Sequence, residues 1–140
     1  MLYYIQIADE ASNAAIKELL RLISTFQARL KEKNPQKAKQ KLRFVAGLKQ
    51  VRYGIRYSSG KVRLLLLAPN TEVCDTIDDK IETLIEEARL RDVPACYCLS
   101  KRILGKAAQM TMKQSVIAVL DPDGAYQYFK SILKFINPSN

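Results

Sequence analysis

The chain has 140 residues, of which 48% are hydrophobic, and it carries a formal net charge of +9. This length suffices for one domain with a sizeable core, and the apolar content excludes a disordered chain. No apolar run reaches the roughly 18 residues typical of a membrane span, and the N-terminus lacks the pattern of a signal peptide. We therefore expect a soluble, monomeric, cytoplasmic protein with no membrane association, and the nucleus is a second possible location.

The first expected element is a long amphipathic helix from Ser12, a candidate cap, to about Lys33. Its apolar positions recur at three and four residues. They are Ile16, Leu19, Leu20, Ile23, Phe26 and Leu30. Asn34-Pro35 ends the helix, because a residue before proline avoids the helical region. Residues 37–41 then form a basic connector.

Short strands and helices alternate over the rest of the chain. Leu42, Phe44 and Ala46 alternate as in a strand, and Leu48, Val51 and Ile55 follow at helical spacing. Further on we expect a turn at 57–60, a strand buried on both faces at 62–68, a helix at 75–91, a strand at 93–99, a helix at 101–110, a strand at 114–120, a turn at 121–124 and a helix at 125–136. This order predicts an α/β fold with a mixed sheet covered on both sides.

No internal repeat or long linker divides the chain. We expect residues 1–41 to form an N-terminal helix and basic extension that pack on the core, residues 42–136 to form the main domain, and residues 137–140 to form a tail.

Charge is segregated along the sequence. Residues 29–63 contain twelve Lys or Arg and a single acid, Glu32, whereas residues 64–100 contain eight acids and three bases. From Lys101 onward there are six bases and two acids. This distribution predicts a surface that faces a polyanion and a separate solvated face. The alternative is that the lysine-rich helices serve only solubility.

Few residues suggest catalysis or metal binding. The chain has no histidine, the commonest general base and transition-metal ligand. Cys96 and Cys98 are two positions apart, so on a strand they point the same way, and we expect both to pack in the core. The acids between residues 78 and 87 form a solvent-facing stripe on one helix. We therefore expect neither an enzyme nor a metal or cofactor site.

The segment Gly47-Leu48-Lys49-Gln50-Val51-Arg52-Tyr53 is the first candidate site. Its glycine, at a strand-to-helix junction, allows close approach of a ligand, and the helix start offers free amides to phosphate. Lys49 and Gln50 on that first turn carry groups that can read base edges. A plain glycine turn into a surface helix fits equally well, so the residues alone leave both interpretations open.

Two further segments lie beside later strands. Ser100-Lys101-Arg102-Ile103-Leu104-Gly105-Lys106 places three cations around an apolar pair, which is suited to an unstacked base and its phosphates. The alternative is an ordinary helix start. Met110-Thr111-Met112-Lys113-Gln114-Ser115-Val116 is a polar segment that leads into a strand and could face the same ligand.

In this order, the segments resemble the kink-turn-binding ribosomal protein superfamily, and especially its branch that binds SECIS elements, the selenocysteine insertion elements of messenger RNA. Gly47-Leu48-Lys49-Gln50-Val51 is similar to a Gly-Leu-Arg-Glu-Val motif of that family. The other similar segments are Phe26-Gln27-Ala28-Arg29-Leu30, Asn34-Pro35-Gln36-Lys37-Ala38-Lys39, Ala68-Pro69-Asn70-Thr71-Glu72, Leu104-Gly105-Lys106 and Ser115-Val116-Ile117. The chain departs from the motif at Lys49-Gln50, and at Tyr53, where the family usually has lysine.

The resemblance implies a three-layer α/β/α sandwich with a small mixed four-stranded sheet plus an added N-terminal helix. It implies binding to a kinked RNA with tandem sheared G·A pairs, contact with the ribosome and recruitment of the selenocysteine-specific elongation factor. The implied RNA-binding residues are Gly47, Leu48, Lys49, Gln50, Arg52, Tyr53, Lys101, Arg102, Ile103, Leu104, Gly105, Lys106, Lys113, Gln114 and Ser115, with Lys37, Lys39, Lys41 and Arg43 as a basic extension toward RNA or ribosome.

Two alternatives stay open. One is a ribosomal or small-nucleolar-particle member of the same superfamily. The other is a protein-interaction module that kept the fold without binding RNA.

Overall fold

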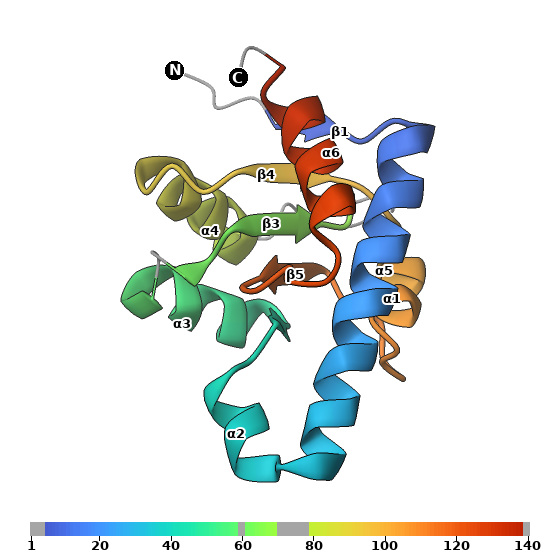
Figure 1. Ribbon diagram of the computed structural model, residues 1–140. Helices are drawn as coiled ribbons and strands as arrows, with labels where there is room; N and C mark the ends of the chain where they lie inside the picture. Colours follow the sequence, from blue (N-terminus) through green and yellow to red (C-terminus); the bar gives the residue numbers. More distant parts are fainter. Residues whose placement is uncertain (1–4, 59–60, 70–78, 139–140) are drawn as a thin grey trace.

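A mixed sheet lies at the centre of the computed structural model, which describes residues 5–58, 61–69 and 79–138 (Figure 1). Five strands pair in the order β1-β4-β3-β5-β2. Their bounds are β1 Gln6–Ile7, β2 Phe44–Ala46, β3 Leu64–Leu67, β4 Ala95–Tyr97 and β5 Val116–Val119. The helices are α1 Glu10–Lys33, α2 Pro35–Gln40, α3 Leu48–Ser58, α4 Asp79–Leu90, α5 Lys101–Ala107 and α6 Tyr126–Ile136. The expected α/β class and element order are confirmed.

The sheet has parallel and antiparallel pairs. Strand β3 runs parallel to β4 and antiparallel to β5, and β5 pairs antiparallel with β2. The expected number of four strands was wrong by one, because β1 adds an edge strand parallel to β4, with Gln6 opposite Cys96. Two paired residues are too few to show an alternating pattern in the sequence.

Two apolar clusters cover the two faces of the sheet. Leu64 and Leu66 face the cluster that contains the apolar stripe of α1 and residues of α5 and α6. Leu65 and Leu67 face the cluster formed with α3 and α4. Successive side chains of a strand point to opposite faces, so all four leucines are buried. This arrangement is the expected three-layer sandwich (Figure 1).

Helix α1 begins earlier than the sequence indicated. Asp9 is the N-cap, and its carboxylate accepts a 2.8 Å hydrogen bond from the backbone amide of Ser12. That bond holds the pKa of Asp9 below its usual value. The expected cap Ser12 is instead buried inside the first turn. Aspartate and serine both cap helices well, and the pattern alone did not distinguish them.

The expected basic connector after α1 is itself the short helix α2. The side chain of Asn34 accepts a hydrogen bond from the Lys37 amide at 3.1 Å, and Pro35 occupies the first turn. Proline is favoured there because its missing amide would have no helical partner. Helix α3 also runs further than expected and takes in Tyr57 and Ser58, whereas the remainder of the expected turn lies outside the described residues.

The described cysteines are core residues, as expected. Cys96 and Cys98 both belong to the cluster on the α1 side of the sheet. Burial raises the pKa of the Cys96 thiol to about 12 and that of Cys98 to about 11. Both thiols therefore stay protonated and unreactive near neutral pH.

Within the described ranges, no helix combines the length and apolar character needed to cross a membrane. The same residues contain no cluster of three or more acids, cysteines or histidines suited to a metal ion.

Candidate nucleic-acid interface

The three candidate segments of the sequence meet at one edge of the sheet. The Gly47 amide donates to the Val116 carbonyl at 3.1 Å, which joins the start of α3 to the start of β5. The Gln114 amide donates to the Lys101 carbonyl at 3.0 Å, which joins the residues just before β5 to α5. Segments that are far apart in the chain thus form one continuous surface through main-chain hydrogen bonds.

Gly47 has the backbone conformation that the first segment requires. Its φ is +92°, a left-handed value that glycine adopts without steric cost. A Cβ placed on Gly47 would lie 4.0 Å from Oε1 of Gln114, so the absence of a side chain leaves the approach to Gln114 open. Its carbonyl accepts the first helical bond of α3, from Val51 at 3.0 Å. The glycine therefore turns the chain sharply from β2 into α3.

The first turns of α3 present polar groups to solvent. Lys49, Gln50 and Tyr53 are exposed, whereas Val51 is fully buried beneath them. Arg52 is half-buried, and its charge adds to the Arg56 hydrogen bond, the main cause, in lowering the pKa of Glu87 on α4. The exposed set lies beside the N-terminal end of the helix, which carries the positive end of the helix dipole.

The α5 segment divides into exposed cations and buried apolar residues. Ser100 caps the helix, and Lys101, Arg102 and Lys106 are exposed. Leu104 is 0% exposed and belongs to the core, so its side chain does not lie on the surface that we expected to meet RNA. Burial of Leu104 follows from its position on the face of this short helix that packs on the sheet.

Gly105 is also buried and serves close packing. A Cβ on Gly105 would lie 2.3 Å from the Met112 carbonyl oxygen. A direct RNA contact by Gly105 is therefore not supported. Ile103 is half-buried against the core, so only part of it faces outward.

The third segment contributes mainly backbone. Lys113 is exposed, whereas Gln114 and Ser115 are half-buried. The Ser115 carbonyl accepts a hydrogen bond from the Ala68 amide at 2.9 Å, which fixes the segment to the end of β3. The side chain of Gln114 remains beside Gly47 and can reach the same ligand as α3.

A groove between α1 and α5 places residues of α1 that the sequence did not indicate beside the α5 residues that it did. It encloses about 500 Å³. Its lining residues are Lys17, Glu18, Arg21, Arg102, Ile103, Lys106, Ala107 and Gln109. Gln109 ties the two helices together, because its side-chain amide donates to Oγ1 of Thr25 at 2.8 Å. Only the packing of α1 beside α5 brings Lys17 and Arg21 to Arg102 and Lys106, and no sequence signal could have located the two α1 cations.

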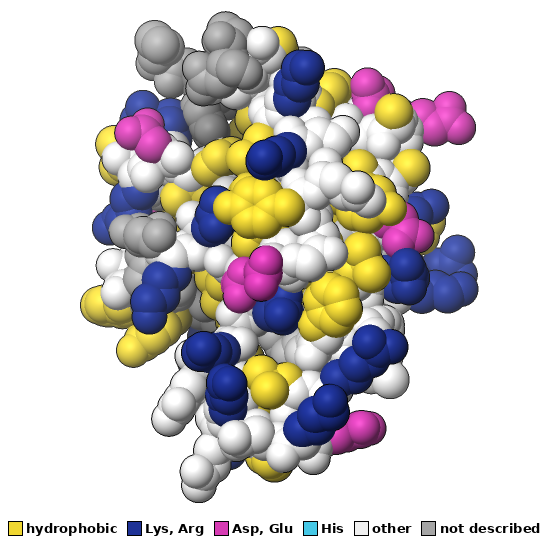
Figure 2. All heavy atoms as spheres, viewed as in Figure 1, with side chains coloured by type: hydrophobic (Ala, Val, Ile, Leu, Met, Phe, Trp, Pro, Cys, Tyr) yellow, Lys and Arg dark blue, Asp and Glu magenta, His cyan; other side chains and the backbone are white. Residues whose placement is uncertain are grey.

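The basic extension separates into exposed lysines and one structural arginine. Lys37, Lys39 and Lys41 are exposed at α2, and Figure 2 shows Lys and Arg side chains gathered around α2 and the adjoining end of α1. Arg43 instead donates to the Asp123 carbonyl, and its guanidinium lies 5.0 Å from the centre of the Phe26 ring. Arg43 is thus held by the fold, unlike the three lysines.

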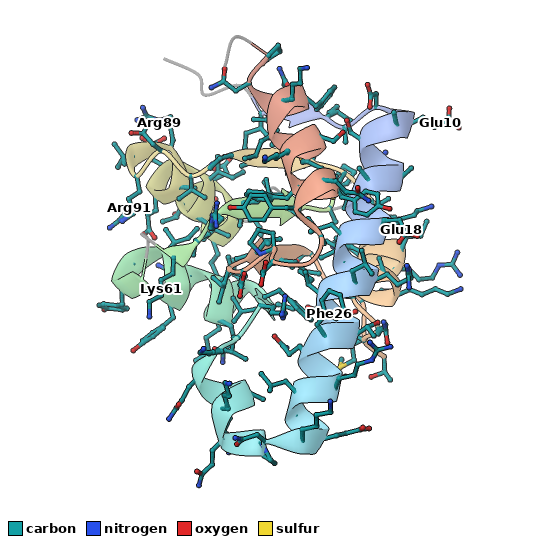
Figure 3. All side chains as sticks on the ribbon, in the orientation of Figure 1. Glu10, Glu18, Phe26, Lys61, Arg89 and Arg91 are labelled. Atoms are coloured by element: carbon teal, nitrogen blue, oxygen red, sulfur yellow. The ribbon has the colours of Figure 1, made fainter. Side chains whose placement is uncertain are left out.

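Phe26 and Gln27 also have structural partners. Phe26 lies against Gly124, in the loop before α6, where a Cβ would meet its ring at 2.7 Å (Figure 3). The Gln27 side chain accepts a hydrogen bond from the Arg43 amide at 2.8 Å. This pair, noted in the sequence for its resemblance to a known family, fastens α1 to the chain around β2.

The fold and the cationic edge define an α/β/α domain of the kind found in ribosomal and related proteins. The chain belongs to the ribosomal protein L7Ae/L30e/S12e/Gadd45 family, whose model matches residues 28–128. Most of α1 precedes the matched region.

Two comparisons extend this result. The chain is 27% identical over 135 residues to the selenocysteine insertion sequence-binding protein 2 of Rattus norvegicus, covering 94% of this chain and 16% of the relative. It is 24% identical to the human selenocysteine insertion sequence-binding protein 2-like, covering 12% of that protein. The chain thus spans only a small part of these relatives.

Among solved structures, the fold is similar to that of a Giardia lamblia 15.5kD RNA binding protein, with a TM-score of 0.67 at 17% identity over 96% of this chain and 94% of that one.

Proposed function

We propose that this chain is an RNA-binding domain that recognises a kinked, SECIS-type RNA with tandem sheared G·A pairs. The observation that carries the proposal is a pair of main-chain hydrogen bonds, from Gly47 to Val116 and from Gln114 to Lys101, which bring the three segments together at a cationic edge of the sheet. The similarity to selenocysteine insertion sequence-binding protein 2 supports the SECIS element as the target.

The chemistry of the edge favours an irregular RNA over a duplex. A-form duplex has a narrow major groove that side chains cannot read, whereas sheared pairs leave guanine edges open. Lys49 supplies donors only, and Gln50 supplies one acceptor and two donors. These two exposed side chains would read the sheared pairs, while the amides at the start of α3 receive a phosphate.

The surrounding cations would position the backbone of the RNA. Lys101, Arg102, Lys106 and Lys113 are exposed near the same edge. Phosphate contacts fix the orientation of a nucleic acid without reading its sequence. The lysines of α2 would extend this contact to more of the RNA or to the ribosome.

In the cell, we propose that the domain supports selenocysteine insertion in cytoplasmic translation, acting as a monomer beside the ribosome and the selenocysteine-specific elongation factor. Charge favours RNA over a protein-interaction role, since a module that had lost RNA binding would have no need for so basic a surface.

A gel-shift experiment at physiological salt tests the proposal with three RNAs of equal length: a SECIS element, a simple kink-turn and a plain duplex. We expect the SECIS element to bind about tenfold or more tightly than the duplex, since one good base contact is worth about 1–3 kcal/mol. Equal affinity for all three would refute kink recognition. Equal affinity for the two kinked RNAs would favour the ribosomal or nucleolar alternative, and absence of binding would favour a protein-interaction module.

A further inference from the structure

Two tyrosines on α3 expose their rings to solvent without a role in the core. Tyr53 is 63% exposed and Tyr57 is 71% exposed. Their ring centroids are 4.9 Å apart, with an angle of 47° between the planes. Neither ring belongs to the two core clusters formed by the described residues. Paired aromatic rings in water expose a large apolar area that usually has a binding partner.

The tyrosines continue the proposed base-reading surface along α3. Lys49, Tyr53 and Tyr57 are spaced by four residues, which aligns them on one face of a helix. The opposite face carries Val51 and Ile55, which are fully buried. At a rise of 1.5 Å per residue, the face with Lys49, Tyr53 and Tyr57 extends the proposed RNA-binding surface about 12 Å beyond Lys49.

The surroundings of the two rings are positively charged. Charge complementarity therefore favours a polyanion as the ligand of this surface. Helix α3 has no acidic residue between Leu48 and Ser58. Glu87 of the neighbouring helix α4 is paired with Arg56 of α3, since its carboxylate lies 2.8 Å from the Arg56 guanidinium. Lys61 is exposed at the far end of the helix (Figure 3), and Figure 2 shows hydrophobic and basic side chains adjoining over α3.

We propose that Tyr53 and Tyr57 form a stacking platform for an unpaired nucleotide of the RNA bound at the start of α3. This inference rests on the proposed RNA-binding function and adds a single-stranded element to the ligand. Only an unpaired base offers a free face to an aromatic ring, since the faces of duplex bases are covered by their neighbours. Two rings tilted against each other offer one face for stacking and one edge for lateral contact. The phosphate of the stacked nucleotide would lie toward Lys49.

A single-tryptophan variant tests the platform directly. The chain contains no tryptophan, so Tyr57→Trp introduces the single tryptophan of the chain at the site. The probes are two kink-turn RNAs that differ only in whether the nucleotides flanking the kink are unpaired or paired. We expect the tryptophan fluorescence to be quenched when the RNA with the unpaired flank binds. It should change little when the RNA with the paired flank binds. If both RNAs bind and give the same tryptophan emission spectrum, the proposed stacking platform is refuted.

Affinity measurements with matched variants provide the second test. Replacing both residues, Tyr53→Leu with Tyr57→Leu, keeps apolar volume but removes the aromatic faces. We expect about tenfold weaker binding of the RNA with the unpaired flank and a clearly smaller loss of affinity for the RNA with the paired flank. The pair Tyr53→Phe with Tyr57→Phe should retain wild-type affinity. Tyr126→Leu is the control, since Tyr126 is a partly exposed tyrosine on α6.

The outcomes separate this inference from the proposed function. If the wild-type chain does not distinguish kinked RNA from duplex, the proposed function fails. If it does, but the double leucine variant binds both flanked RNAs as the wild type does, only the platform is refuted. Loss of self-association in the leucine variant, with RNA affinity unchanged, would assign the rings to a protein contact and also overturn the platform.

Discussion

The backbone amide of Gln114 donates a 3.0 Å hydrogen bond to the carbonyl oxygen of Lys101. This bond fixes the segment before β5 against the first residue of α5, so the cations of α5 keep a constant position relative to α3. The same segment brings Met112 so close to Gly105 that a side chain has no room between them. The arrangement of the interface therefore depends on backbone packing as much as on its exposed side chains.

The first prediction concerns Gly105. We expect Gly105→Ala to destabilise the domain by about 1–3 kcal/mol, because the new Cβ would meet a backbone oxygen that cannot move cheaply. Urea denaturation measures the change in the free energy of unfolding. Gly54→Ala is the matched control, since its Cβ would lie 3.6 Å from a Val62 methyl group, an ordinary contact within a helix. The control should be neutral or stabilising by about 0.5–1 kcal/mol, and equal destabilisation of the two variants would contradict the packing argument.

The second prediction concerns base reading by Gln50. We expect Gln50→Ala to narrow the affinity gap between an intact kink-turn and one with disrupted G·A pairs by about 1–3 kcal/mol. The salt dependence should stay the same, because no charge is removed. Lys49→Ala should narrow the gap and also lower the salt slope. Binding titrations with both RNAs at several salt concentrations measure these effects. A Gln50→Ala variant that discriminates as the wild type does would refute the assignment.

The third prediction separates the exposed lysines of α2 from Arg43. We expect joint replacement of Lys37, Lys39 and Lys41 by glutamine to weaken the binding of all RNAs alike and to lower the salt slope by roughly one unit for each phosphate that is no longer neutralised. Arg43→Gln should instead lower the unfolding midpoint, because Arg43 bonds to the Asp123 carbonyl. Filter binding and thermal unfolding distinguish the two effects. Weakening restricted to one RNA sequence would argue against a phosphate role for the lysines.

The fourth prediction concerns the ion pair between α3 and α4. The Arg56 guanidinium donates to the Glu87 carboxylate, and this hydrogen bond is the main cause that lowers the pKa of Glu87. Because the pKa of Glu87 is lower in the folded state, its ionised form stabilises the fold at pH values above its unfolded-state pKa of about 4.3. This stabilisation is lost as the pH falls through the folded-state pKa. Glu87→Gln should therefore lower the melting temperature at pH 7, and the difference from wild type should shrink below about pH 4. A difference that is independent of pH would show that the pair does not act through charge.

The sequence determined the elements whose pattern is local. The spacing of Ile16, Leu19 and Ile23 predicted α1, and the run Leu64–Leu67 predicted a strand buried on both faces. Both predictions were correct because side-chain periodicity follows directly from helix and strand geometry. The turn at Gly47 could also be identified from sequence, since few residues other than glycine adopt its positive φ.

Tertiary packing decided the rest. Ile103 and Leu104 are neighbours of the same chemical kind, and only the packing of α5 on the sheet buries Leu104 completely. Strand β1 exists because β4 offers an edge for pairing, not because its two residues carry a pattern. Lys17 of α1 joins Lys106 of α5 in one groove because the two helices lie together on the same face of the sheet, a relationship between distant residues that no local pattern encodes.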